Sequence, residues 1–208
     1  MSKAAELAAL IGSGQAQGDK NLIINGAMQI SQRGTSEASV TSSQYADAPD
    51  RFKVAITTGG TWTVSQSTTS PDGFSNSYKF DCTTANGSLS SDSNIQLLQR
   101  IEGQNLQRLA KGTSSAKSVT VSFYVRTNKT GTYTLELFDR DNTRVFSKTY
   151  TVSSADTWEF KSVTFAGDTS GALDNDNAVS LDVSWFLAAG TDFTSGTFSS
   201  GWASKTDA

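Results

Sequence analysis

Apolar and polar residues alternate through most of the chain after Lys20. The alternation is clear in 119–125, VTVSFYV, and again in 179–187, where the odd-numbered residues are apolar. Successive side chains of a β-strand point to opposite faces, so a period of two predicts a strand with one buried face. The segments with this pattern, or with a weaker form of it, are 52–56, 62–64, 78–82, 95–101, 119–125, 133–137, 145–152 and 179–187.

Polar turn residues separate these predicted strands. The chain of 208 residues contains 17 glycines and two prolines, and 36% of its residues are apolar. Many short strands joined by Gly, Asn, Asp and Ser turns are typical of an antiparallel sandwich. We therefore predict an all-β fold, a jelly-roll sandwich over residues 21–208, with a short helical turn at 103–110.

One predicted strand, TWEFKSVTF at 157–165, changes phase along its length. Trp158 and Phe160 are even-numbered, whereas Val163 and Phe165 are odd-numbered. A slip of one residue turns every later side chain to the other face. Either a β-bulge in the middle of this segment keeps all four side chains in the core, or the strand is buried on both faces.

The stretch LIINGAMQISQRG at 22–34 permits two interpretations. Its Asn-Gly pair is a frequent hairpin turn, but the residues that follow are few for a returning strand. We therefore predict that residues 22–30 form the first strand, bent at Asn25 and Gly26, where glycine permits a bulge. Arg33 would pair with Asp50 and join two strand ends.

A single segment, residues 3–12, has a helical period. Its apolar stripe at i, i+3, i+4 and i+7 consists of Ala4, Leu7, Ala8 and Ile11. A helix this short is marginal in water, so we predict that residues 1–14 dock on a partner or bundle with copies of themselves. The alternative is a frayed terminus. Residues 15–20 have the composition of a flexible linker.

Charge and composition exclude several kinds of function. The formal net charge is −3, which disfavours nucleic acid as a partner. Histidine is absent, which removes the usual triads and His-based metal sites. The lone Cys82 forms no intrachain disulfide, and its alternation with Tyr78 and Phe80 predicts a core position. No apolar run approaches the ~18 residues of a membrane-spanning helix. We expect no catalytic residue, no metal and no cofactor.

Aromatic residues are the candidates for ligand binding. A ring exposed on a sheet face presents an electron-rich surface on which the CH groups of a sugar can stack. The candidate glycan-binding residues are Tyr124, Trp62, Trp158 and Trp202. Most tryptophans of such a fold pack in the core. Tyr124 is favoured for exposure because it alternates against an apolar row, and Trp202 lies in a Gly/Ser-rich tail.

Two motifs near the N-terminus resemble a known family. NLIINGAMQISQRG at 21–34, followed by YADAPDRFKV at 45–54, resembles the opening of bacteriophage tail-fibre and related virion proteins of the marine-phage and cyanophage type. The segments 97–137, 157–171 and 181–202, in this order, are similar to a carbohydrate-binding-module-like jelly roll. The similarity covers about residues 20–202.

This resemblance implies a non-enzymatic virion protein on the tail or capsid surface. It would be a tail-fibre or spike component that forms a homo-oligomer, expected to be a trimer. Its partners would be other virion proteins and a host cell-surface polysaccharide. The alternative is a structural capsid-decoration or tail-adaptor protein. Relatives continue through a closing strand, so the sheet is expected to close differently, or with a partner chain, or in a longer protein. A polysaccharide-cleaving enzyme would need a defined carboxylate pair, for which the sequence contains no signal.

Overall fold

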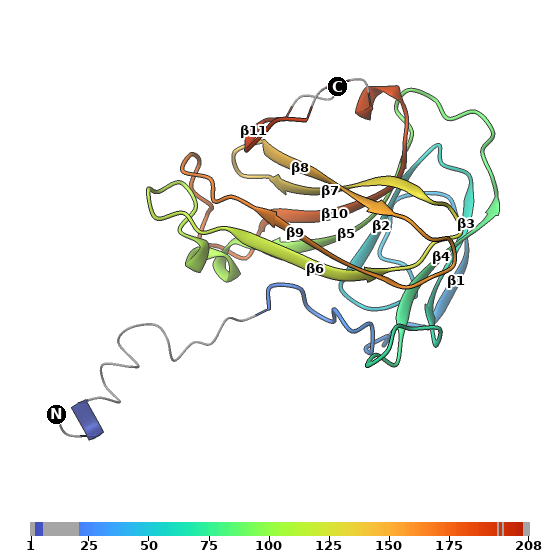
Figure 1. Ribbon diagram of the computed structural model, residues 1–208, viewed down its shortest axis with the longest axis horizontal. Helices are drawn as coiled ribbons and strands as arrows, with labels where there is room; N and C mark the ends of the chain where they lie inside the picture. Colours follow the sequence, from blue (N-terminus) through green and yellow to red (C-terminus); the bar gives the residue numbers. More distant parts are fainter. Residues whose placement is uncertain (1–2, 6–20, 195, 197, 206–208) are drawn as a thin grey trace.

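The computed structural model describes residues 3–5, 21–194, 196 and 198–205 (Figure 1). These residues form an antiparallel β-sandwich, which confirms the predicted all-β fold class. Residues 3–5 are helical and Ala4 is exposed, while Leu7, Ala8 and Ile11 of the predicted anchor lie outside the described residues. In the part of the chain that the structure describes, no helix is long and apolar enough to cross a membrane.

One layer of the sandwich is a six-stranded sheet with the order β11-β8-β7-β10-β5-β2. Its strands are β2 (Phe52–Thr57), β5 (Asn94–Glu102), β7 (Gly131–Asp139), β8 (Arg144–Val152), β10 (Val179–Ala189) and β11 (Ala203–Ser204). Three short 3-10 helices lie in its connections, at η1 (Gly103–Asn105), η2 (Gln107–Leu109) and η3 (Thr191–Phe193). The first two occupy the helical turn predicted at 103–110.

The opposite layer consists of two smaller sheets. The three-stranded sheet contains β1 (Ser36–Val40), β3 (Thr61–Ser67) and β4 (Ser77–Thr84), and the two-stranded sheet contains β6 (Val119–Val125) and β9 (Glu159–Phe165). Figure 1 shows β6 and β9 running beside each other along one side of the six-stranded sheet. The chain crosses between layers from β5 to β6 to β7, and from β8 to β9 to β10, as in a jelly roll.

Two apolar clusters hold the layers together. The first joins the β6–β9 sheet to the six-stranded sheet and includes Leu135, Phe146, Phe165 and Val183. The second joins the three-stranded sheet to β2 and β5 and includes Val40, Val54, Val64 and Ile95. The odd-numbered residues of β7 and β10 supply the first cluster, as their alternation predicted, so the even-numbered residues of these strands point away from it.

The predicted first strand at 22–30 is wrong, because this segment is a turn and an irregular loop. Asn25 has a positive φ of 58°, and its side-chain amide bonds both the N–H and the carbonyl of Ile30, at 3.0 and 2.8 Å. Asn25 tolerates this left-handed conformation, and its side chain replaces strand hydrogen bonds. The predicted link between Arg33 and Asp50 is confirmed at 3.8 Å, and Arg33 also donates to the carbonyls of Tyr45 and Ala46.

The two interpretations of the phase change in β9 are also wrong. β6 and β9 pair residue by residue without a bulge, and Phe160 is 57% exposed while Phe165 is fully buried. The even-numbered residues of β9 therefore face solvent, and Phe160 is an exposed aromatic residue instead of a core residue. The predicted core position of Cys82 is also wrong, because its side chain is exposed near the end of β4.

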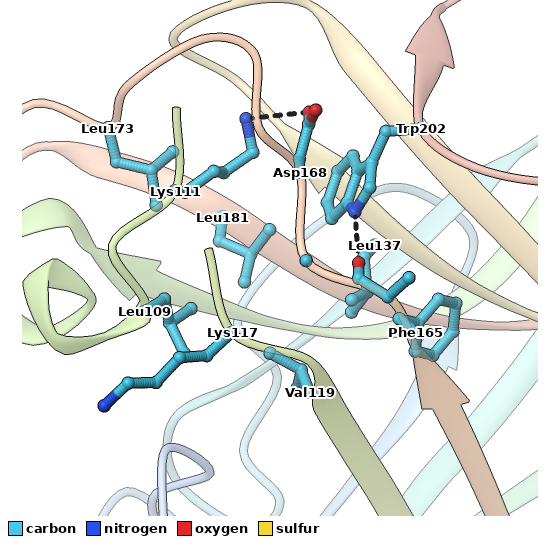
Figure 2. A pocket seen from close by; sticks show the side chains of 12 residues that line it. Leu109, Lys111, Lys117, Val119, Leu137, Phe165, Asp168, Leu173, Leu181 and Trp202 are labelled. Carbon is cyan, nitrogen blue, oxygen red and sulfur yellow. Dashed lines mark hydrogen bonds and ion pairs between the residues drawn. The ribbon is translucent and has the colours of Figure 1, made fainter. Parts of the chain in front are cut away.

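A buried ion cluster lies at the end of the first core cluster (Figure 2). The Lys111 ammonium pairs with Asp139 and with Asp168, the latter at 3.2 Å, and donates to the carbonyls of Ser170 and Gly171. Arg144 donates to both oxygens of Asp168, at 2.6 and 3.1 Å. These bonds tie the β7–β8 turn, the loop after β9 and the segment before β6 to one point.

The loss of folding stability at acid pH should depend on Asp168. Burial opposes ionisation of this carboxyl, but the hydrogen bonds from Arg144, Ser170 and Lys111 outweigh it and hold the pKa of Asp168 below its ordinary value of 3.8. Its stabilising effect is present above that ordinary value and is lost as the pH falls through the lower folded pKa. In urea unfolding from pH 7 to pH 2.5, Asp168→Asn should show a shallower pH dependence than the wild-type chain. Equal slopes below pH 4 would contradict this assignment.

Candidate functional site

The outer face of the β6–β9 sheet presents an exposed row of side chains. Tyr124 lies directly opposite Phe160, Ser122 opposite Ser162, and Thr120 opposite Thr164. The apolar partners on the other face, Val121, Val163 and Phe165 among them, are buried in the core. Alternation along the two strands therefore places two aromatic rings and four hydroxyl groups on one solvent-facing surface.

Three aromatic side chains meet at one end of this face. Tyr124 is 42% exposed, and its ring centroid lies 5.3 Å from that of Phe160 and 5.8 Å from that of Phe74. Phe74 is 43% exposed and comes from the loop between β3 and β4. We call these three residues, Phe74, Tyr124 and Phe160, the aromatic platform.

Local hydrogen bonds hold Phe74 in position. The N–H of Phe74 donates to the carbonyl of Pro71 at 3.1 Å, and the Ser70 hydroxyl donates to the carbonyl of Phe74 at 2.6 Å. Gly73 has a φ of 85°, which favours glycine, and it completes this turn. The Ser77 hydroxyl closes the loop by donating to Thr69. The ring of Phe74 is therefore presented on a braced turn.

Hydroxyl groups continue the surface beyond the platform. The Ser122 and Ser162 hydroxyls are 3.0 Å apart, and those of Thr120 and Thr164 are 2.9 Å apart, and all four residues are exposed. Each hydroxyl is both donor and acceptor, so it can exchange its cross-strand bond for one to a ligand hydroxyl. This ladder and the platform together form an apolar patch with an adjoining polar strip.

The loop between β8 and β9 borders the platform and is held by one carboxylate. Glu159 accepts from the N–H groups of Ser153 and Ser154, at 2.8 and 2.7 Å, and pairs with Lys161 at 2.6 Å. The hydrogen bond from Lys161 is the largest cause that holds the pKa of Glu159 below its usual range. Glu159 is therefore ionised at neutral pH, which is the state in which it accepts these hydrogen bonds.

The structure divides the four predicted glycan-binding residues. Tyr124 is exposed and belongs to the platform, which agrees with the expected exposure. Trp158 is half-buried and directly precedes β9, close in sequence to Phe160. Trp62 and Trp202 lie elsewhere and pack against the second and the first core cluster.

The indole N–H groups of these two tryptophans are also occupied. Trp62 donates to the carbonyl of Gly59 at 2.8 Å and contacts Phe80 edge to face. Trp202 donates to the carbonyl of Ala166 at 2.9 Å, and Lys111 lies 5.2 Å above its ring. Figure 2 shows the Trp202 ring among apolar side chains that include Leu137 and Phe165. Trp202 is therefore a packing residue, although its tail suggested a free side chain.

Sequence reasoning missed Phe160 and Phe74. The phase change predicts a core position for Phe160. Its alternation with Ser162 and Thr164, which are also even-numbered, indicates the outer face instead. Phe74 lies in a loop without periodicity, so only the tertiary structure brings it to Tyr124.

Fold and site together define a β-sandwich module with an exposed aromatic and hydroxyl face. Comparison with known protein families, with curated proteins and with solved structures gives no match to this chain. The exposed surface of the sandwich is therefore the feature of this chain that indicates its function. In the described part of the chain, no group of three or more Cys, Asp or Glu side chains is placed to hold a metal ion.

Proposed function

We propose that this protein is a glycan-binding component of a bacteriophage virion. In this proposal the β-sandwich binds a host-surface polysaccharide through the aromatic platform, and residues 1–14 anchor the chain to other virion proteins or to its own copies in a trimer. Its role is binding, and no catalytic step is assigned to it.

The main support for glycan binding is the contact between three exposed aromatic rings beside a hydroxyl ladder. Aromatic rings offer an electron-rich face to the polarised CH groups of a sugar, and the serine and threonine hydroxyls can bond its hydroxyl groups. Apolar side chains gathered on the surface of a soluble domain indicate an interaction site.

The virion assignment depends on the sequence resemblance of 21–34 and 45–54 to phage tail-fibre proteins. In the structure these two segments contact each other, because Asp50 bonds the N–H of Gln32 and Arg33 bonds the carbonyls of Tyr45 and Ala46. The motif is therefore a structural joint of the module. Recognition would take place on the β6–β9 face, and repeated copies in a trimer would strengthen weak single sites.

Glycan arrays and calorimetry on the full chain test this proposal. Tyr124→Ala and Phe160→Ala should each weaken binding by about tenfold or more, because central aromatic residues dominate such sites. Phe198→Ala is the matched control, since Phe198 is 54% exposed but lies in the C-terminal segment. Unchanged affinity in both platform variants, or no binding to any host envelope glycan, would refute the proposal.

The same exposed platform also favours a second candidate, a structural adaptor that uses the sandwich for protein contacts. The two candidates differ in what Tyr124→Ala changes. If the protein is an adaptor, the wild-type chain should bind no glycan. Tyr124→Ala should then change the oligomeric state of the chain or prevent its incorporation into particles. Sedimentation of the wild-type and Tyr124→Ala chains separates these outcomes.

A further inference from the structure

Positive side chains gather on the outer face of the six-stranded sheet, away from the aromatic platform. Asp182 in β10 lies opposite Phe138 in β7 and Arg100 in β5, and all three are even-numbered residues whose neighbours in sequence face the core. Lys53 in β2 lies opposite Leu98 on the same face, and Arg140 follows β7 directly.

Asp182 is the carboxylate at the centre of this group. Arg140 donates to Asp182 Oδ2 through Nε and Nη2, at 2.9 and 2.7 Å. Arg100 Nε lies 3.6 Å from Asp182 Oδ1, too far for a hydrogen bond, and neither of these two atoms has a hydrogen-bond partner. Asp182 is only 3% exposed, whereas the Arg100 and Arg140 side chains are 27% and 37% exposed.

Cations outnumber carboxylates in this group. Arg140 and Lys205 both lie over the Phe138 ring, at 5.4 and 4.5 Å. The side-chain ammonium of Lys53 makes no hydrogen bond or ion pair with any residue that the structure describes. In the sheet, Lys53 lies opposite Leu98 of β5, and Arg100 is two residues further along β5 on the same face. Burial and the charges of Arg100 and Arg140 hold the pKa of Lys53 below its usual range.

The other carboxylates of this face are already engaged. Glu102 accepts from Arg51 at 2.9 Å, and Glu136 accepts from the Ser147 hydroxyl at 3.0 Å. Asp182 alone therefore cannot balance Lys53, Arg100 and Arg140, in a protein whose overall charge is −3. Like charges held close together cost free energy unless an anion joins them.

We propose that Lys53, Arg100 and Arg140 form an oxyanion-binding site for a carboxylate, sulfate or phosphate group. The planar guanidinium of Arg100 presents N–H donors in a fork that matches two oxygens of such a group. The Lys53 ammonium supplies a further charged donor from the neighbouring strand. Asp182 holds Arg140 in place, and its negative charge limits the affinity of the site for an anion. The site therefore suits an anion that binds reversibly.

This site is separate from the aromatic platform and does not depend on the proposed function. The platform belongs to the β6–β9 layer, whereas the oxyanion site belongs to the six-stranded sheet, which forms the opposite layer (Figure 1). The residues of the oxyanion site lie on the face of that sheet that points away from the first core cluster. Variants of one site should leave the other unchanged, so the failure of either proposal is recognised independently.

Titration of the ¹⁵N-labelled full chain at low ionic strength tests the site. The probes are sodium sulfate, sodium phosphate and sodium acetate, together with an oligogalacturonate and a neutral oligosaccharide of the same length. Saturable amide shifts in β2, β5 and β10 are expected with the anionic probes and not with the neutral one. Tighter binding of the oligogalacturonate identifies a polymer-borne carboxylate as the source, whereas equal binding of the free ions identifies a small anion.

Substitutions complete the test. Lys53→Gln leaves both ion pairs of Asp182 in place, and it should raise the dissociation constant for sulfate about tenfold, as should Arg100→Gln. Lys79→Gln is the matched control, because it removes one charge from an exposed pair with Asp81 on the opposite layer. Absence of saturable shifts with every anion, or equal dissociation constants in Lys53→Gln and Lys79→Gln, would overturn the proposal.

Discussion

Lys111→Met should lower the free energy of unfolding by about 3–5 kcal/mol, the usual result of removing one partner from a buried ion pair. The Lys111 ammonium is buried between Asp139 and Asp168, which are 0% and 6% exposed. Methionine fills a similar volume, so the loss measures charge instead of packing. Without the ammonium, Arg144 is the one cation of the cluster that remains beside two buried carboxylates, so one negative charge is unbalanced.

Urea unfolding followed by tryptophan fluorescence provides this measurement, because Trp202 lies 5.2 Å from the Lys111 nitrogen. Lys79→Met is the control, since its pair with Asp81 is exposed and should change stability by less than about 1 kcal/mol. Adding Asp139→Asn to Lys111→Met should recover part of the loss. A decrease below about 1 kcal/mol in Lys111→Met would show that the cluster is not a stabilising centre.

Phe165→Ala should destabilise the sandwich by about 3–5 kcal/mol. The Phe165 side chain is fully buried in the first core cluster and meets Phe146 edge to face at 5.3 Å between centroids. It therefore joins β9 to the six-stranded sheet. Its loss leaves a cavity between the layers that the strands, which are fixed by their hydrogen bonds, fill only in part.

Phe160→Ala on the same strand is the matched comparison. Phe160 is 57% exposed, and its ring is tilted against that of Tyr124 at 5.3 Å between centroids, so its removal should cost at most about 1 kcal/mol. Thermal and urea unfolding of both variants test the difference. Similar losses in Phe160→Ala and Phe165→Ala would contradict the assignment of opposite faces in β9, and with it the exposed platform.

Local sequence pattern was sufficient for most strands but failed where a side chain replaced backbone pairing. β6 and β10 follow from their alternation alone, because a strand with one buried face must repeat every two residues. Residues 22–30 contain an apolar run, yet Asn25 bonds Ile30 and Asp50 and turns the chain into a loop. The partner Asp50 is distant in sequence, so this loop could not be predicted from the residues next to Asn25.

The candidate sites were less predictable than the strands. Tyr124 was recognised from its alternation, whereas Phe74 joins it through a loop and Phe160 through the register of β6 with β9. The oxyanion site had no signal in the sequence. Its cations lie on β2, on β5 and after β7, and β10 lies between two of these strands in the sheet.

The β-sandwich could be predicted from the sequence alone, because period-two alternation is a local property and each apolar face must be buried against another layer. The same alternation predicted that Tyr124 faces away from the core. Which exposed residues are neighbours follows from the tertiary fold and not from any local pattern. The β3–β4 loop brings Phe74 to Tyr124, and strand order and register place Lys53 on the same face as Arg100. Contacts between segments that are distant in sequence leave no periodic pattern along the chain.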